Sequence, residues 1–262
     1  LTGTFDLGAR QFSLDGIGQL PEGRALRMHL QGAIANLPPL ANPGPDRFEE
    51  CTSPGGTPVT LDATASSDPD GNAIAHFQWF SGDQGLGNTP IVQAVAKLGA
   101  NAFDLHVYDQ DLASGAQRLS LTVRDTVAPS LEVSVQPVCL WPPNHAFALF
   151  KLGRELAYTT ADVCDSAPTV RIISVTSDEP TLAEGSGSTE VDVRFGATTA
   201  CVRSERTGPG EGRSYTVLFE AQDAAGNSTR KSVKVFVPHD KSTHPDCARA
   251  EGVAFLGPEC EQ

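Results

Sequence analysis

Residues 58–80 have the sequence PVTLDATASSDPDGNAIAHFQWF, and this stretch decides the fold class. Apolar and polar residues alternate on both sides of a central turn that is rich in Asp, Pro, Asn and Gly. Alternation with a period of two is typical of half-buried strands, and these turn residues let a chain reverse its direction. The stretch therefore predicts two strands joined by a tight acidic turn.

Short alternating segments of the same kind continue along the chain. Turn signals separate them at the intervals expected of a β-sandwich. The 25 glycines and 19 prolines also favour many short strands over long helices. We therefore predict an all-β fold made of tandem immunoglobulin-like sandwiches. The expected strands cover 59–65, 74–80, 91–96, 102–109, 117–125, 131–135, 146–152, 168–177, 190–195, 199–206, 214–223 and 231–237.

Two proline-containing segments divide the chain. Residues 38–46, PPLANPGPD, contain four prolines and cannot form the interior of a strand. Residues 125–130, DTVAPS, form a second linker. The predicted parts are an N-terminal β-segment (1–37), a first sandwich (38–125), a second sandwich (126–240) and a disulfide-tied tail (241–262).

The N-terminal segment alternates as strands do. Leu26, Met28 and Leu30 fall on one face of a predicted strand over 26–36, and residues 4–16 resemble a hairpin. Two or three strands are too few to bury a core of their own. We expect the segment to be part of a larger domain or to dock on a neighbour, including a second molecule through strand addition.

The two sandwiches share an internal repeat. Residues 103–125 parallel residues 217–237, since each is an alternating strand, an Asp, a Gly-containing turn and another alternating strand. Asp109 and Asp223 hold the same place in the two copies. Both are expected to accept backbone N–H bonds within the turn.

These motifs resemble bacterial extracellular modules. Residues 39–125 are similar to a PKD-type domain, on the proline-rich entry, VTLDATASSDPDG, HFQW and the closing hairpin. Residues 126–240 resemble the Ig-like, hyalin-repeat-like modules of multidomain surface proteins, on LWPPNH, ADVCD, SVTSDEP, RSERTGPGEGR, AQDAAGNST and VPHD. The resemblance implies spacer, adhesive or carbohydrate-contacting roles, often beside larger enzymes.

The charge balance excludes some partners. Asp and Glu number 32 against 19 Lys and Arg, for a net charge of -13. Nucleic-acid binding needs clustered cations, and anionic lipid surfaces also attract basic chains, so neither partner is expected. No run of eighteen apolar residues is present, and no membrane span is predicted.

The six cysteines predict disulfides. They stand at Cys51, Cys139, Cys164, Cys201, Cys247 and Cys260, with no CxxC pair. Scattered cysteines in even number indicate an oxidising compartment, so the protein is predicted to be secreted or at the cell surface. The expected bridges are Cys247–Cys260, Cys164–Cys201 and Cys51–Cys139, although spacing alone does not fix connectivity.

The acidic turn has two interpretations. Asp68, Asp70 and Asn72 could supply oxygen ligands to calcium, the only cofactor that the sequence suggests, and some PKD-like domains bind calcium near this turn. Alternatively, Asp68 and Asp70 accept nearby N–H bonds while Gly71 takes a positive φ.

A second group of residues suggests ligand contact. Trp141 precedes two prolines and would be a sugar-stacking platform if exposed, or would pack at the domain junction. Arg203, Glu205 and Arg213 surround a Gly-rich turn and form either a patch for sugar or carboxylate or an Arg–Glu ladder across a hairpin. Trp79 is expected in the first core.

Motifs for catalysis are missing from the sequence. There is no GxSxG, HExxH, Walker loop or Rossmann glycine motif in its required setting. The prediction is a non-enzymatic binding, adhesion or spacer protein that contacts surface polysaccharide or protein. The alternatives are accessory modules of a larger secreted hydrolase, or a structural subunit of an extracellular filament assembled by strand addition.

Overall fold

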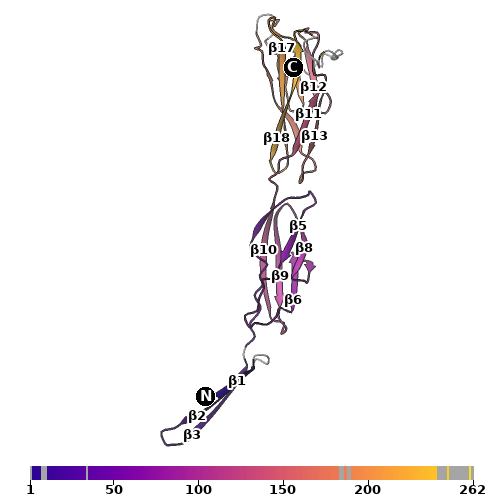
Figure 1. The fold of residues 1–262 in the computed structure, drawn as a ribbon. Helices are drawn as coiled ribbons and strands as arrows, with labels where there is room; N and C mark the ends of the chain where they lie inside the picture. The colour runs from indigo at the N-terminus through magenta and orange to yellow at the C-terminus, as the bar shows by residue number, and fades with distance from the viewer. Residues whose placement is uncertain are drawn as a thin grey trace. The chain divides into compact units, whose positions relative to one another are not determined.

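The computed structural model describes residues 2–6, 11–33, 35–182, 186–187, 190–240, 247 and 260. These residues form eighteen strands and no α-helix, which confirms the all-β prediction (Figure 1). The chain divides into two compact units. Unit 1 comprises Leu1–Glu50 with Gly56–Arg124, and unit 2 comprises Cys51–Gly55 with Asp125–Gln262.

Unit 1 begins with a separate antiparallel sheet. Its order is β1-β2-β3, and its strands are β1 (Thr2–Asp6), β2 (Gln11–Gln19) and β3 (Ala25–Ala33). The register pairs Phe12 with both Phe5 and Gly32, and Leu14 with both Gly3 and Leu30. Directly paired residues share a face, so this register separates the apolar from the polar side chains of the sheet.

The sandwich of unit 1 contains two sheets. The larger has the order β4 (Arg47–Glu50), β10 (Ser114–Arg124), β9 (Gly99–Tyr108), β6 (His76–Ser81) and β7 (Gln84–Gly87). The smaller pairs β5 (Thr57–Asp62) with β8 (Ile91–Ala96), and Figure 1 shows them side by side. Buried and exposed residues alternate along β5 and β8. Trp79 is fully buried, which confirms its predicted place in the core.

Unit 2 contains three small sheets. They are β11 (Ser130–Val135) with β13 (Leu156–Ala161), then β12 (Phe147–Lys151) with β16 (Thr199–Arg203) and β15 (Val193–Phe195), and β14 (Thr169–Ser177) with β17 (Gly212–Gln222) and β18 (Ser228–Pro238). One apolar cluster joins them, with Leu140, Phe150, Tyr215 and Phe219 among its fully buried members. This arrangement is a second β-sandwich.

The repeated hairpins are β9–β10 and β17–β18. Oδ1 of Asp109 accepts the N–H of Ala113 at 2.9 Å, and Oδ1 of Asp223 accepts that of Asn227 at 2.8 Å. Both residues are buried. The predicted turn role of these two carboxylates is confirmed.

Three strands were not predicted: β4, β7 and β13. Each is short, and β7 contains two glycines, so none shows a long enough alternation to be recognised. The strand predicted over 190–195 is reduced to Val193–Phe195. Neighbouring strands supply the hydrogen bonds that these short segments need, and sequence patterns do not contain that information.

All six cysteines form disulfides, as predicted, but the three predicted pairings are wrong. The bonds are Cys51–Cys164, Cys139–Cys247 and Cys201–Cys260, with Cα–Cα distances of 6.0, 5.3 and 5.7 Å. Each joins residues at least 59 positions apart. Bonding needs Cα atoms within about 7 Å, and the folding of the strands decides which cysteines meet that condition.

Candidate functional site

The acidic turn of unit 1 is a capped turn. Oδ1 of Asp68 accepts the N–H of Asp70 at 2.8 Å, and the carbonyl of Asp68 accepts the N–H of Gly71 at 3.0 Å. Gly71 has a φ of 78°, which glycine adopts without steric cost. Oδ2 of Asp70 accepts the N–H of Leu37 at 2.8 Å and so fastens the incoming chain to the turn.

One carboxylate oxygen of this turn, Oδ2 of Asp68, makes none of the hydrogen bonds described above. Asp68 is 9% exposed, and its Oδ2 is buried without a hydrogen-bond partner in the described part of the chain. Oδ1 of Asn36 is in the same condition, while Nδ2 of Asn36 donates to Asp109 at 2.6 Å. Asn72 is exposed. Calcium coordination by Asp68, Asp70 and Asn72 stays a prediction, and the unpaired oxygen of Asp68 is the feature that agrees with it.

Unit 2 contains an acidic cluster that the sequence analysis missed. Asp125, Asp162 and Asp223 each place a carboxylate oxygen within 4.8 Å of the others. Asn227 donates its backbone and side-chain N–H groups to Asp223. Asp162 accepts the N–H of Cys164 at 2.7 Å. The three aspartates are spread over almost a hundred residues, so the sequence pattern could not show that they lie together. Only Asp223 was singled out, for its role in the turn of the repeated hairpin.

Arg213 lies at the centre of a buried ion network in unit 2. Its guanidinium is 0% exposed and contacts Asp192, Glu179 at 3.1 Å and Glu205 at 3.6 Å. It also donates to the hydroxyl of Tyr215 at 3.1 Å. Burial opposes the charge of Arg213, but its bonds to Tyr215 and the carboxylates outweigh burial, so its pKa lies above the ordinary value.

Tyr215 completes this network. Its hydroxyl donates to the backbone carbonyl of Arg203 at 2.8 Å. Burial raises the pKa of Tyr215, because the phenolate is disfavoured away from water. The hydroxyl therefore keeps its proton at neutral pH and serves as a fixed donor.

The residues predicted to contact a ligand have different settings. Glu205 and Arg213 are enclosed, so their Arg–Glu pairing is internal and is no ladder on an exposed hairpin. The side chain of Arg203 is 17% exposed, lies 4.1 Å from the centre of the Phe147 ring and donates to the carbonyl of His145 at 2.8 Å. Trp141 is half-buried. Ligand contact by this group stays a prediction.

No model of a known protein family matches the chain, and no curated protein matches it. Within the described residues, no helix has the length and apolar character that a membrane crossing needs.

Solved structures of extracellular β-modules are similar. The fibronectin(III)-like modules of CbhA from Clostridium thermocellum match at 14% identity and a TM-score of 0.26, over 76% of this chain and 90% of theirs. Cadherin domains 3–6 of protocadherin gamma B2 match at 12% and 0.39, over 88% and 60%. SGBP-B of Bacteroides ovatus, in complex with a mixed-linkage heptasaccharide, matches at 15% and 0.28, over 79% and 49%. At these values none carries an argument about the function of this chain.

Proposed function

We propose that the chain is an extracellular, non-enzymatic tether that spaces or attaches other surface components. The observation that carries this proposal is the layout of its three disulfides. All six cysteines are bonded, and the bonded pairs are 113, 108 and 59 residues apart. Stable disulfides belong to oxidising compartments, which agrees with secretion or surface display.

The disulfides shorten the covalent path from one end to the other. Force applied at the termini passes from Cys51 directly to Cys164 and then from Cys201 to Cys260. Residues 52–163, which include every strand of the unit 1 sandwich except β4, lie outside this path. Those strands would carry no load along the covalent chain when the protein is stretched. A tether that bears load benefits from such protection.

The partners are proposed to be surface polysaccharide or surface protein. The half-buried Trp141 and the acidic turn around Asp68 are the places proposed for ligand and calcium. A glycan array probed with and without calcium addresses both. Attachment to a larger secreted hydrolase would be a special case of the same tethering function.

Single-molecule stretching of the full chain between terminal handles tests the tether. About 90 residues remain in the covalent path, so the oxidised protein should extend to about 300 Å, against about 900 Å after reduction, at about 3.5 Å per residue. Equal extension under oxidising and reducing conditions would overturn the proposal.

Two double variants provide a matched comparison. Cys51→Ala with Cys164→Ala leaves the path to run through Cys139–Cys247, and the extension should increase by about 200 Å. Cys201→Ala with Cys260→Ala should leave the extension nearly unchanged, because Cys139–Cys247 provides a path of similar length. An equal effect of the two double variants would contradict the proposed path.

A further inference from the structure

The N-terminal sheet has one apolar face. The register places every large apolar residue of the sheet except Ile17 on this face, together with glycines. The large members are Phe5, Phe12, Leu14, Leu26, Met28 and Leu30, and the glycines are Gly3, Gly16, Gly18 and Gly32. The described part of this face carries no charged side chain.

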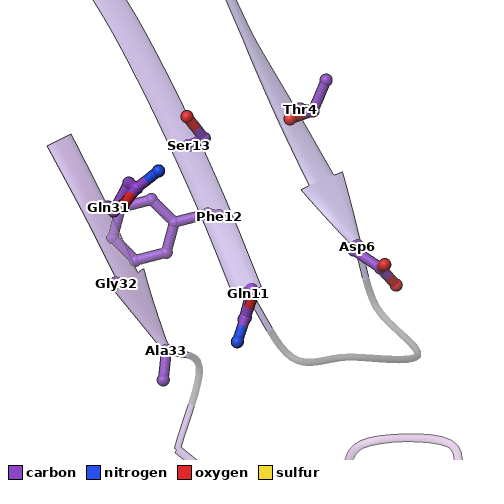
Figure 2. A pocket seen from close by; sticks show the side chains of 8 residues that line it. All are labelled: Thr4, Asp6, Gln11, Phe12, Ser13, Gln31, Gly32 and Ala33. Carbon is purple, nitrogen blue, oxygen red and sulfur yellow. The ribbon is translucent and has the colours of Figure 1, made fainter. Parts of the chain in front are cut away.

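The opposite face is mainly polar. It includes Thr4, Ser13 and Gln31 in one row, and Asp15 paired with His29 at 2.6 Å in another. Figure 2 shows Thr4, Ser13 and Gln31 around the sheet, with the Phe12 ring lying across β3. A sheet that is apolar on one side only is built to be covered on that side.

Within the described residues nothing covers the apolar face. Its strands pair only with one another, and Phe5 is 65%, Leu30 54%, Met28 49% and Leu26 44% exposed. A sheet normally buries its hydrophobic face against a second layer of structure. Contiguous apolar patches on a soluble protein mark interaction sites.

We propose that this face docks onto the same face of a second copy of the chain. A second copy is favoured first by the complementary shape of the two faces. A two-fold axis that runs parallel to the sheet between the two copies, perpendicular to the strands and level with Asp15, sets Phe12 of one copy opposite Gly18 of the other. The same axis sets Leu14 opposite Gly16 and Leu26 opposite Gly32.

Large residues thus stand opposite glycine positions, of which Gly18 is open, whereas Gly32 is already covered by the Phe12 ring of its own copy. Only Leu30 and Met28 meet each other, at the level next to the axis. A two-fold axis along the strands would instead set Phe12 against Phe12. The side chains of two packed sheets must interdigitate across about 10 Å, which the first arrangement allows. Gly18, where a Cβ would meet nothing within 4 Å inside one copy, therefore serves as the socket for Phe12.

The available area decides the strength of the association. Nine residues at about 3.3 Å and three strands at about 4.8 Å give a face of roughly 400 Å². Two faces together cover roughly 800 Å², which is below the range of stable specific interfaces and within that of weak, transient ones. We therefore expect a dimer in the micromolar range. The uncharged face suits this contact, because the chain carries a net charge of -13 and copies repel elsewhere.

Sedimentation of the full oxidised chain over 1 to 500 µM, a span that brackets a weak interface, tests the dimer. A monomer–dimer equilibrium is expected. The decisive variant is Gly18→Val, since a Cβ at Gly18 meets nothing within 4 Å inside one copy. Valine suits strands, so the sheet should stay intact while the socket for Phe12 is filled. Dimerisation should weaken at least tenfold.

Two further variants complete the test. Leu30→Asp sets a charge beside the axis and should abolish the dimer, whereas Gln31→Asp on the opposite face should leave it unchanged. Circular dichroism of each variant checks that the strands persist. A chain that stays monomeric throughout, or a Gly18→Val variant that dimerises like the parent, would overturn the proposal. This inference is independent of the disulfide path, because it can fail while the stretching experiment succeeds.

Discussion

The most deeply buried charged residues in the described part of the chain lie in a network of partners. Arg213 and Glu205 are fully enclosed, and Asp192 is 4% exposed. A buried ion network adds little net stability compared with apolar packing, but it becomes costly when one member is removed. The reason is that the remaining charges cannot return to water. Arg213 is the member whose loss leaves most charge uncompensated.

Replacing Arg213 with Met should therefore destabilise unit 2 strongly. The carboxylates of Glu179, Asp192 and Glu205 would lose their shared cation, at a cost of about 3–5 kcal/mol. Urea unfolding followed by the fluorescence of Trp141 measures the effect. The control is Arg118→Met in unit 1, which removes a solvent-exposed pair with Asp104 and should destabilise unit 1 far less, as followed by the fluorescence of Trp79. Similar losses in both variants would contradict this account.

The lowered pKa of Glu220 predicts that the stability of unit 2 depends on pH. Hydrogen bonds from Arg171 and Arg230 lower the pKa of Glu220 below its ordinary value. The folded state therefore holds its proton less tightly than the unfolded state, whose pKa is about 4.3. The stability from this carboxylate is present above that pKa and is lost as pH falls through the lower folded-state pKa.

Glu220→Gln should accordingly have a lower unfolding midpoint than the parent at pH 7. The difference should vanish at strongly acidic pH, where the parent side chain is also neutral. Thermal unfolding measured across the acidic range checks this expectation. A gap of constant size at every pH would mean that Glu220 contributes through packing and not through its charge.

At the scale of elements, residues 36 and 37 attach the entering chain to the first sandwich. Nδ2 of Asn36 donates to the fully buried Asp109, and the N–H of Leu37 donates to Asp70. The strands β1–β3 pair only among themselves in the described part of the chain. Asn36 and Leu37 therefore bind the first sandwich, whereas β1–β3 form no strand pairing with it.

Two deletions distinguish these roles. Removing residues 1–34 should leave the unfolding midpoint of the first sandwich unchanged. Removing 1–37 should leave it folded but about 1–3 kcal/mol less stable, because the buried Asp109 loses a donor. Urea unfolding followed by Trp79 fluorescence measures both. If the shorter deletion already unfolds the sandwich, the N-terminal sheet is an integral part of that domain.

At the scale of the whole molecule, the three disulfides restrict the unfolded chain strongly because each closes a long loop. Closing a loop of about 100 residues removes unfolded-state entropy worth about 4.7 kcal/mol in the chain-entropy account. Two of the bonds hold Cys247 and Cys260 to Cys139 and Cys201 of unit 2. Because the bonded segments overlap in sequence, no single break returns the chain to full length.

The sequence by itself determined the fold class. Alternation along β5, β9, β10, β17 and β18 is a local property, and so is the turn chemistry of Asp68, Gly71, Asp109 and Asp223. The core position of Trp79 followed from the same pattern. These features could be predicted because each depends on neighbours within a few residues.

The tertiary structure alone decided the disulfide pairs, the burial of Arg213 and the cluster of Asp125, Asp162 and Asp223. Each depends on residues tens of positions apart, which packing of the sheets brings within a few ångströms. The apolar face of the N-terminal sheet lies between these cases. Alternation placed Leu26, Met28 and Leu30 together, but the pairing of β1, β2 and β3 was needed to set Phe5 and Phe12 on the same face as these three residues. Strand register is a non-local choice, and a shift of one residue would have reversed it.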